Sequence, residues 1–149
     1  MELKLRLTED GLSHLKQFEG CRLKAYRDAV GVATIGYGQT GGVTLGMTIT
    51  QEQADFMLLS YLVKQEEYMQ NLLSDVVLTD NQWDALVLFA YNVGLGNFKK
   101  SELLKKVLKD PNDPTIYQEF GRWTKARGQN LVSLVRRRAW EAARYTGAV

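Results

Sequence analysis

The stretch "QFEGCRLKAYRDAVGVATIGYG", residues 17–38, decides how the chain folds. It begins at the end of a segment, 8–19, whose apolar residues recur at helical spacing, with Thr8 as a candidate N-cap and Gly20 as the stop. It continues into short β-prone pieces that glycines interrupt as far as residue 48, which predicts a small antiparallel sheet with tight turns. A helix followed by a small sheet, with helical patterns after it, indicates an α+β protein.

Helical periodicity resumes after the predicted sheet. The sequence "TQEQ" at 50–53 has the form of a capping box and opens a long helix over about 50–75, whose apolar stripe has a gap near Gln65. Further helices are predicted after the capping box "TDNQ" at 79–82, within "KKSELLKKVLK" at 99–109, from "DPT" at 113–115 with Pro114 at the first helical position, and over 131–145. No linker divides the chain, so residues 1–149 are predicted to form a single domain.

Cysteine and histidine usage limits the chemistry. Cys21 is the only cysteine and His14 the only histidine, which excludes an internal disulfide and a zinc site built from those ligands. Cys21 is either a catalytic nucleophile or a small buried apolar residue, and the second interpretation is favoured because no orienting pattern surrounds His14. We therefore predict no metal and no other cofactor.

Charge is distributed unevenly along the chain. Residues 1–98 carry a net charge of −5 and residues 99–149 a net charge of +7. A basic C-terminal third predicts an anionic partner, namely nucleic acid, a membrane surface or an anionic polymer, with a solvated charged face as the plain alternative. Nucleic acid is the weakest of these because no recognition motif accompanies the basic residues.

Neither a signal peptide nor a membrane span is apparent. The N-terminal "MELKLRLTEDG" lacks an apolar core. The longest apolar run, "ALVLFAY" at 85–91, is far shorter than the ~20 residues that cross a bilayer. We therefore predict synthesis in the cytoplasm without a signal peptide and without stable membrane insertion.

Two carboxyl groups in the opening stretch lie in unlike surroundings. Glu19 ends a helix, where the negative end of the dipole and the neighbours Phe18 and Tyr26 favour a protonated acid, whereas Asp28 follows in a polar turn that favours its charged form. One proton donor and one carboxylate are what glycoside hydrolysis uses, and Thr34 offers a hydroxyl for orienting a water. Surface acids at helix ends and turns are also common, so this spacing alone leaves both interpretations open.

The segment "LKQFEGCRLKAYRDAVGVATIGYGQT", residues 15–40, resembles the catalytic signature of the phage-type lysozymes, or endolysins, of glycoside hydrolase family 24. Glu19, Asp28 nine residues later and Thr34 six residues after that match its three positions. The resemblance continues in "ALVLFAYNVGLGNFKKSELLKKV" and in "RWTKARGQNLVSLVRRRAWEAARY", so it covers nearly the whole chain in the family's order.

This resemblance implies a fold and an activity. It implies a single lysozyme-like domain with a small-sheet lobe over about 8–60, a connecting helix over about 50–75, a helical lobe over about 76–149, and a cleft between the lobes. It also implies hydrolysis of the β-1,4 bond between N-acetylmuramic acid and N-acetylglucosamine in peptidoglycan. The alternative is a catalytically inactive module that binds peptidoglycan without cutting it.

Roles for individual residues follow from the same resemblance. Glu19 is expected to be the general acid, and Asp28 either stabilises developing positive charge or acts as base toward a water held with Thr34. The family is usually described as inverting, which requires room for that water. Arg136 or Arg137 is expected to pair with Glu19, although an exposed arginine face on the helix would explain the same residues.

Candidate substrate contacts lie further along the chain. Asn92 and Asn97 are expected to hydrogen-bond the sugars, and Trp123 to stack on them, with helix capping, turn formation and packing as their alternatives. Gln39 departs from the family's pattern, which has histidine there, and this puts a supporting contact in doubt.

The resemblance also implies where the protein works and with what. The expected partner is the glycan strand of peptidoglycan, bound by a monomer that requires neither nucleic acid nor a cofactor. The expected site of action is the cell wall after membrane permeabilisation, with a phage holin or another export route as the hypothesis for how the protein reaches it.

Overall fold

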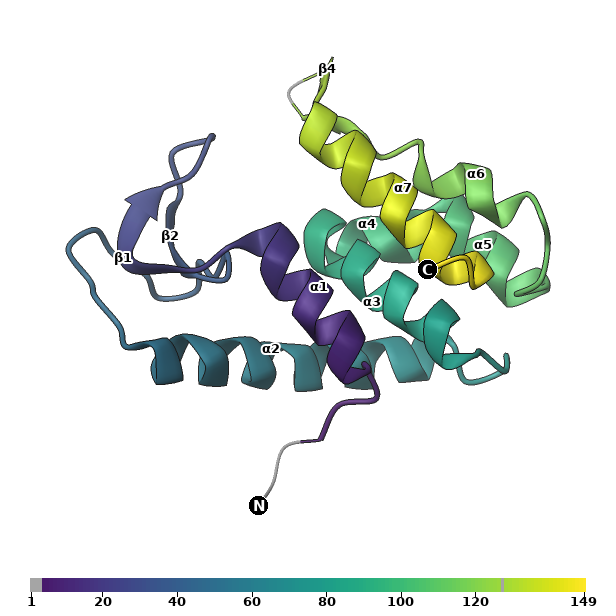
Figure 1. Cartoon of the computed structure of the whole chain (residues 1–149), viewed down its shortest axis with the longest axis horizontal. Helices are drawn as coiled ribbons and strands as arrows, with labels where there is room; N and C mark the ends of the chain where they lie inside the picture. Colours follow the sequence, from purple (N-terminus) through teal and green to yellow (C-terminus); the bar gives the residue numbers. More distant parts are fainter. Residues whose placement is uncertain (1–3, 127) are drawn as a thin grey trace. The chain divides into compact units, whose positions relative to one another are not determined.

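The structure of the chain is a computed structural model that describes residues 4–126 and 128–149 (Figure 1). In chain order its elements are α1 (Glu9–Glu19), β1 (Arg22–Arg27), β2 (Ala33–Gly36), α2 (Gln51–Leu72), α3 (Asp80–Val93), α4 (Leu95–Lys100), α5 (Glu102–Lys109), α6 (Ile116–Phe120), β3 (Lys125–Ala126), β4 (Gln129–Asn130) and α7 (Val132–Thr146). The predicted fold class is confirmed, because helices dominate and an antiparallel β1–β2 pair follows the first helix.

The chain divides into two compact units. The first unit consists of residues 12–64 with residues 4 and 5, and the second unit consists of residues 6–11 and 65–149. Helices α1 and α2 therefore contribute residues to both. In α2 the boundary between the two units falls before Gln65, where the apolar stripe is interrupted. The buried Gln65 amide donates to the Val87 carbonyl over 3.0 Å. The single-domain assignment and the predicted lobe bounds stay predictions.

The two predicted capping motifs at the starts of α1 and α2 are present. The Thr8 hydroxyl accepts a hydrogen bond from the Gly11 N–H over 3.0 Å at the start of α1. At the start of α2, Thr50 and Gln53 bond each other's backbone N–H groups with their side chains, over 3.1 and 2.8 Å. These bonds satisfy donors that the first turn of a helix leaves without intrahelical partners.

The sheet of the first unit is small and irregular. Strands β1 and β2 pair antiparallel, with Tyr26 opposite Thr34, and their register shifts between Arg22 and Tyr26. The opposite edge of β1 bonds the segment after residue 46, through Ala25 N–H to Met47 and Ile49 N–H to Leu23. The buried apolar residues of this unit come from the strands and from α1 and α2, and they include Leu15, Ala25, Ile35, Ala54, Leu58 and Leu62.

The second unit is organised around α3. Residues 82–90 of this helix are all buried, and α7 packs against α3 and α6 (Figure 1). The Phe89 ring makes edge-to-face contacts with Phe98, Phe120 and Trp123. The predicted capping box of Thr79 and Gln82 opens α3. A helix that is apolar on nearly all sides is thus the core of its unit.

Three local features differ from the sequence-based predictions. Helix α6 begins at Ile116 and not at Pro114, because the Asp113 carboxylate bonds the backbone N–H and the hydroxyl of Thr115 and closes a turn before the helix. The short helix α4 was not predicted. Neither was the β3–β4 hairpin, whose strands are two residues each.

Candidate active site

Glu19 is the last residue of α1 and is half-buried. The helix stops there because Gly20 takes a φ of +67° and donates its N–H to the Lys16 carbonyl over 2.9 Å, a conformation that favours glycine. Gly38 approaches the same carboxyl group: a Cβ added at Gly38 would lie 3.2 Å from Glu19 Oε1. The sequence did not predict this close approach of the backbone to Glu19. The second glycine of "TIGYG", Gly38, was a signal for it.

Asp28 belongs to a tight turn between β1 and β2. Its Oδ1 atom accepts hydrogen bonds from the N–H groups of Val30 and Val32, both over 2.9 Å, as aspartate commonly does in turns. Its Oδ2 atom has no hydrogen-bond partner within residues 4–126 and 128–149. One oxygen thus fixes the orientation of the carboxylate, and the other stays available as an acceptor.

Thr34 lies on β2 and is buried, with 3% of its surface exposed. Its hydroxyl donates to the Val32 carbonyl over 2.8 Å. That carbonyl also accepts the backbone N–H of Asp28 over 2.9 Å. Because a hydroxyl has one proton, the Thr34 oxygen has only its lone pairs left to offer. The structure therefore joins Asp28 and Thr34 through one backbone atom, Val32 O.

The residues after Thr34 form a tight loop. Ile35 and Gln39 exchange both backbone hydrogen bonds, each over 2.9 Å. The loop between them contains Gly36 and Gly38, with φ values of +63° and +83°. Gln39, where the family's pattern has histidine, is half-buried at the end of this loop. The backbone pairing at position 39 does not depend on the identity of its side chain.

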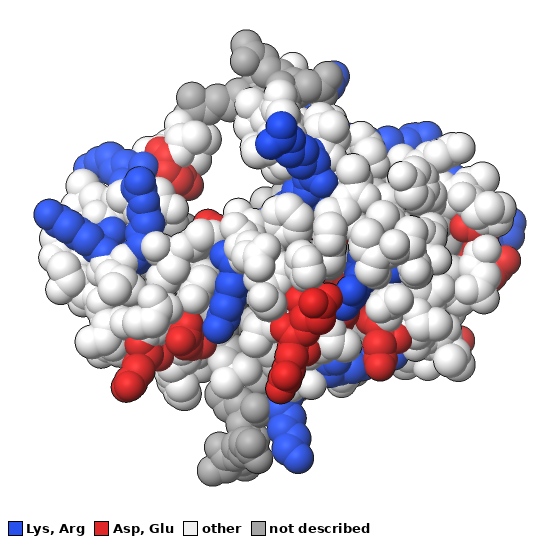
Figure 2. Space-filling view, in the orientation of Figure 1, with Lys and Arg blue, Asp and Glu red and all other residues white. Residues whose placement is uncertain are grey.

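Strand β1, which leads into Asp28, is strongly basic. Arg22, Lys24 and Arg27 are all exposed, and Figure 2 shows Lys and Arg side chains gathered over the region of this strand. The Arg22 guanidinium lies 4.4 Å from the centre of the Tyr26 ring. The positive charge predicted for the C-terminal third therefore also occurs on this strand, although residues 1–98 are acidic as a whole.

The arginines predicted as partners of Glu19 belong to the second unit. Arg136 is exposed on α7. Arg137 is buried, and it bonds the Glu141 carboxylate over 3.1 Å and the Leu88 carbonyl over 2.8 Å. The pairing of either arginine with Glu19 stays a prediction.

The predicted substrate contacts also lie in the second unit. Asn92 is exposed and its carbonyl oxygen accepts from Arg138. Arg138 also donates to the Trp123 carbonyl over 3.0 Å, so it brings Asn92 and Trp123 together. Trp123 is half-buried, with its ring against Phe89. Arg138 was missed, although its spacing of three residues from the acid of α7 was a helical-pair signal.

Asn97 is exposed near the start of α4, and its amide donates to the Val93 carbonyl over 2.8 Å. This bond satisfies a carbonyl at the end of α3, as the capping alternative requires. Its amide oxygen takes no part in that bond.

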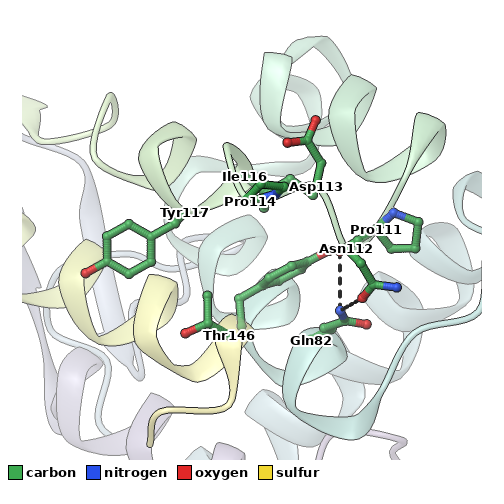
Figure 3. Close-up of a pocket in the computed structure, with 9 residues that line it drawn as sticks. Gln82, Pro111, Asn112, Asp113, Pro114, Ile116, Tyr117 and Thr146 are labelled. Atoms are coloured by element: carbon green, nitrogen blue, oxygen red, sulfur yellow. Dashed lines mark hydrogen bonds between the residues drawn. The ribbon is translucent and has the colours of Figure 1, made fainter.

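A pocket of about 230 Å³ lies in the second unit between the start of α3, the segment 111–117 and the end of α7 (Figure 3). Gln82 donates to Pro111 and Asn112 across it, over 3.3 and 3.1 Å. The Tyr145 hydroxyl donates to the Pro111 carbonyl over 2.6 Å. Burial, with the charge of Asp110, raises the pKa of Tyr145 above its ordinary value. The lining residues thus use these polar groups in hydrogen bonds to one another, and we assign the pocket no ligand.

Metal sites and membrane spans are absent from the described parts of the chain. Within residues 4–126 and 128–149, no three His, Cys, Asp or Glu side chains are grouped so that they could hold a metal ion. In that same part of the chain no helix combines the length and the apolar character that crossing a membrane requires. Cys21 is a half-exposed free thiol, 3.8 Å from the Gln51 amide nitrogen.

Comparison with known sequences shows similarity along nearly the whole chain. The phage lysozyme family model matches residues 16–141. The endolysin of Acyrthosiphon pisum secondary endosymbiont phage 1 is 37% identical over 148 residues, with 97% of this chain and 100% of that protein covered. The endolysin of Bacillus phage PZA is 41% identical over 143 residues, which cover 93% of this chain and 54% of that protein.

Solved structures agree with the sequence matches. The muramidase domain of SpmX from Asticaccaulis excentricus has a TM-score of 0.84 at 34% identity, covering 95% of this chain and 98% of that one. An endolysin from Escherichia coli O157:H7 phage FAHEc1 has a TM-score of 0.84 at 32% identity, covering 100% of this chain and 98% of that one. With these matches over most of its length, the chain belongs to the phage lysozyme family and is a lysozyme-type glycosidase.

Proposed function

We propose that this protein hydrolyses the β-1,4 bond between N-acetylmuramic acid and N-acetylglucosamine, with Glu19 as general acid and with Asp28 and Thr34 holding the attacking water. Membership of the phage lysozyme family supports the coarser statement that it is a muramidase-type peptidoglycan hydrolase. The assignment of the bond and of the three residues goes beyond that membership.

The observation that carries the proposal is the pair of acceptors around Val32 O. The Thr34 hydroxyl donates its hydrogen bond to this carbonyl, and Asp28 Oδ1 accepts the two backbone hydrogen bonds of the turn. The remaining acceptors are the lone pairs of Thr34 Oγ1 and the Oδ2 atom of Asp28. A water has two protons to donate, so these two acceptors suit its orientation.

The proposed reaction uses each group once. Glu19 gives its proton to the glycosidic oxygen as the bond from that oxygen to the anomeric carbon breaks. The water oxygen forms a new bond to the anomeric carbon from the opposite face, and the proton it loses passes to Asp28. The product has an inverted anomeric configuration. Nuclear magnetic resonance of the first product formed tests this, because a retained configuration would require a covalent intermediate and would contradict the role given to water.

Charge supports a polymer substrate with carboxylates. The exposed cations of β1 lie next to Asp28 in the chain, and residues 99–149 carry a net charge of +7. Peptide stems give peptidoglycan a negative charge at neutral pH, so both regions would attract it. We expect activity on isolated peptidoglycan to fall as salt is added, because salt screens interactions between exposed charges.

The decisive experiment compares Glu19→Gln with Glu52→Gln. Both changes remove one carboxyl group from the first unit, and Glu52 is an exposed residue in the first turn of α2. We expect Glu19→Gln to release no new reducing ends from isolated peptidoglycan while keeping the circular dichroism and unfolding midpoint of a folded protein. Glu52→Gln should retain the activity of the unmodified chain. An active Glu19→Gln protein would exclude Glu19 as the general acid.

Mass analysis of the released muropeptides identifies the bond that is cut. Products with reducing N-acetylmuramic acid ends support the proposal, and reducing N-acetylglucosamine ends contradict it. If the unmodified protein sediments with peptidoglycan and releases no reducing ends, the inactive binding module is the correct description.

We further propose that Arg137 or Arg136 pairs with Glu19. A double-mutant cycle of unfolding free energies with Glu19→Gln and each arginine→Gln change tests this. A direct pair predicts a coupling of about 0.5–3 kcal/mol for one arginine only. A coupling energy near zero for both arginines would contradict the proposed ion pair with Glu19.

Asn92, Asn97 and Trp123 are our proposed substrate contacts. The bonds made by the two asparagines leave the Asn92 amide as a donor and the Asn97 amide oxygen as an acceptor, which complement the acceptor and donor of an N-acetyl group. Asn92→Ala, Asn97→Ala and Trp123→Phe are expected to raise KM for soluble glycan strands while kcat changes little. An unchanged KM would exclude the residue concerned.

We propose that the protein acts on the cell wall as a monomer once the membrane is permeabilised, with a holin as one route. Cells that express the protein alone should stay intact until a permeabilising agent is added. Lysis without that agent would contradict this order of events.

A further inference from the structure

Tyr37 lies between the two loop glycines, Gly36 and Gly38, and its side chain is buried with 6% of its surface exposed. Its hydroxyl donates to Asp55 Oδ1 over 3.0 Å and accepts from the Gln51 amide over 3.0 Å. The proposed reaction gives this buried phenol no role.

The acceptor, Asp55 Oδ1, is shared by three groups. Gln51, one turn earlier on α2, also donates to this atom over 3.0 Å, and the Lys16 ammonium lies 3.6 Å from it. The same ammonium is 5.7 Å from the centre of the Tyr37 ring. We call Lys16, Tyr37, Gln51 and Asp55 the Asp55 cluster.

The Asp55 cluster ties together three segments, namely α1, the loop of residues 35–39 and the start of α2. Lys16 is one helical turn before Glu19 on α1, and its carbonyl accepts the Gly20 N–H that ends the helix. Tyr37 immediately precedes Gly38, whose backbone approaches Glu19 Oε1. The other two members of the cluster belong to the first turns of α2.

The hydrogen bond from Tyr37 to Asp55 requires that the Tyr37 phenol keep its proton. Burial, together with the hydrogen bond to Asp55 and the charge of that residue, raises the pKa of Tyr37 to about 12. The phenol is therefore a hydrogen-bond donor over the whole range in which the enzyme is expected to work.

We infer that Tyr37, through Asp55, is a positioning residue that holds Gly38 and the loop of residues 35–39 against the carboxyl group of Glu19. This inference rests on the proposed role of Glu19 as general acid. Placement of a catalytic group acts on the chemical step, because a reacting group displaced by about 1 Å loses much of its rate advantage. Loss of the Tyr37 hydroxyl should therefore lower kcat more than it changes KM.

The chain contains a matched control for this test. Tyr145 is also buried and also donates its hydroxyl, in this case to the Pro111 carbonyl in the second unit. Tyr37→Phe and Tyr145→Phe therefore delete the same atom, and each removes a hydrogen bond that the hydroxyl donates; Tyr37→Phe also removes the one that Tyr37 accepts from Gln51. Both variants should lower the thermal unfolding midpoint, which measures the structural cost of the deletion.

The experiment measures kcat and KM from the initial release of reducing ends from soluble, uncross-linked glycan strands. Tyr37→Phe is expected to lower kcat roughly tenfold, which corresponds to the loss of the hydrogen bond to Asp55, with KM within about twofold. Tyr145→Phe is expected to keep kcat within about twofold of the unmodified protein. Because Tyr37 acts through Asp55, the double variant Tyr37→Phe/Asp55→Ala should lose no more kcat than the more impaired single variant.

Three results would overturn the inference: an unchanged kcat in Tyr37→Phe, an equal kcat loss in the two phenylalanine variants, or losses that multiply in the double variant. Glu19→Gln, assayed beside them, separates this inference from the proposed function. If Glu19→Gln is inactive and Tyr37→Phe is fully active, only the positioning role fails. If Glu19→Gln is active, the proposed function fails.

Discussion

In the first unit Asp28 keeps one carboxylate oxygen without a partner in the part of the chain that the structure describes, whereas in the second unit Asp84 is completely buried and both of its oxygens are bonded. Glu66 of the second unit is similar, since its oxygens accept from Arg6, Leu7 and Trp83. Buried acids whose oxygens are all satisfied fix a fold, and a half-satisfied acid near the surface keeps capacity for a ligand. The difference separates acids that stabilise from acids that are candidates for chemistry.

The largest expected effect on this comparison comes from Asp84→Ala. Asp84 accepts from Arg144 over 2.8 Å and from the Thr8 N–H over 2.9 Å. Its removal leaves a buried arginine without this partner, so we expect a loss of about 3–5 kcal/mol in the free energy of unfolding, measured with urea. Asp75→Ala, at an exposed position, is the control. A loss below about 1 kcal/mol at Asp84 would contradict its assignment as a stabilising acid.

Asp28→Asn is expected to lower activity and to leave stability nearly unchanged. Asparagine keeps the Oδ1 acceptor that closes the turn, so the unfolding midpoint should change little. It cannot take a proton from water, so kcat should fall on the order of 100-fold or more. If the variant keeps kcat within about threefold and loses stability instead, Asp28 belongs with the stabilising acids.

Two substitutions at Thr34 test whether its hydroxyl group takes part in the reaction. Thr34→Val keeps the shape of the side chain and removes the oxygen, and we expect kcat to fall about tenfold or more because an acceptor for water is lost. Thr34→Ser keeps the oxygen and should recover most of the rate. Equal rates for the valine and serine variants would show that packing, and not the hydroxyl, is what matters at this position.

Asp55 gives the first unit a smaller, pH-dependent contribution. Partial burial acts to raise the pKa of Asp55, but hydrogen bonds from Gln51 and Tyr37, with the charge of Lys16, outweigh it and hold the pKa below its ordinary value. Asp55 therefore stabilises the fold above its ordinary pKa, and this contribution is lost as the pH falls through the lower, folded pKa. The unfolding free energy of Asp55→Asn should fall less steeply on acidification than that of the unmodified chain. Identical pH dependences would contradict this.

The smallest effect is expected for Cys21→Ser. Cys21 is two residues from Glu19, and the proposed reaction gives its thiol no role. Activity on peptidoglycan should stay within about twofold, as measured by reducing ends. Complete loss of activity in a folded protein would revive the nucleophile alternative for Cys21.

Much of the fold was predictable because its signals are local. The capping pairs at Thr50 and Thr79 and the glycine after Glu19 mark helix ends through bonds between residues three or four apart. Helix α6 was misplaced because Asp113 bonds within a turn of its own, which sequence patterns do not distinguish from a helix cap. The β3–β4 hairpin escaped prediction because strands of two residues show no alternation.

The candidate site was predictable in part. The spacing of Glu19, Asp28 and Thr34 made them candidates, and the resemblance to a known family gave them roles. The hydrogen bond of Tyr37 to Asp55 joins residues 18 positions apart, and that of Arg138 to Asn92 joins residues 46 positions apart. Such contacts depend on tertiary packing, so no local pattern indicates them.

The carbonyl oxygen of Val32 has a consequence for how this protein is studied. It is the shared acceptor for the Asp28 N–H and the Thr34 hydroxyl, yet it belongs to the main chain. The Val32 side chain is 43% exposed, so an alanine scan would report position 32 as tolerant. Replacing the amide between residues 32 and 33 by an ester, which weakens the carbonyl as an acceptor, would reveal what such a scan conceals.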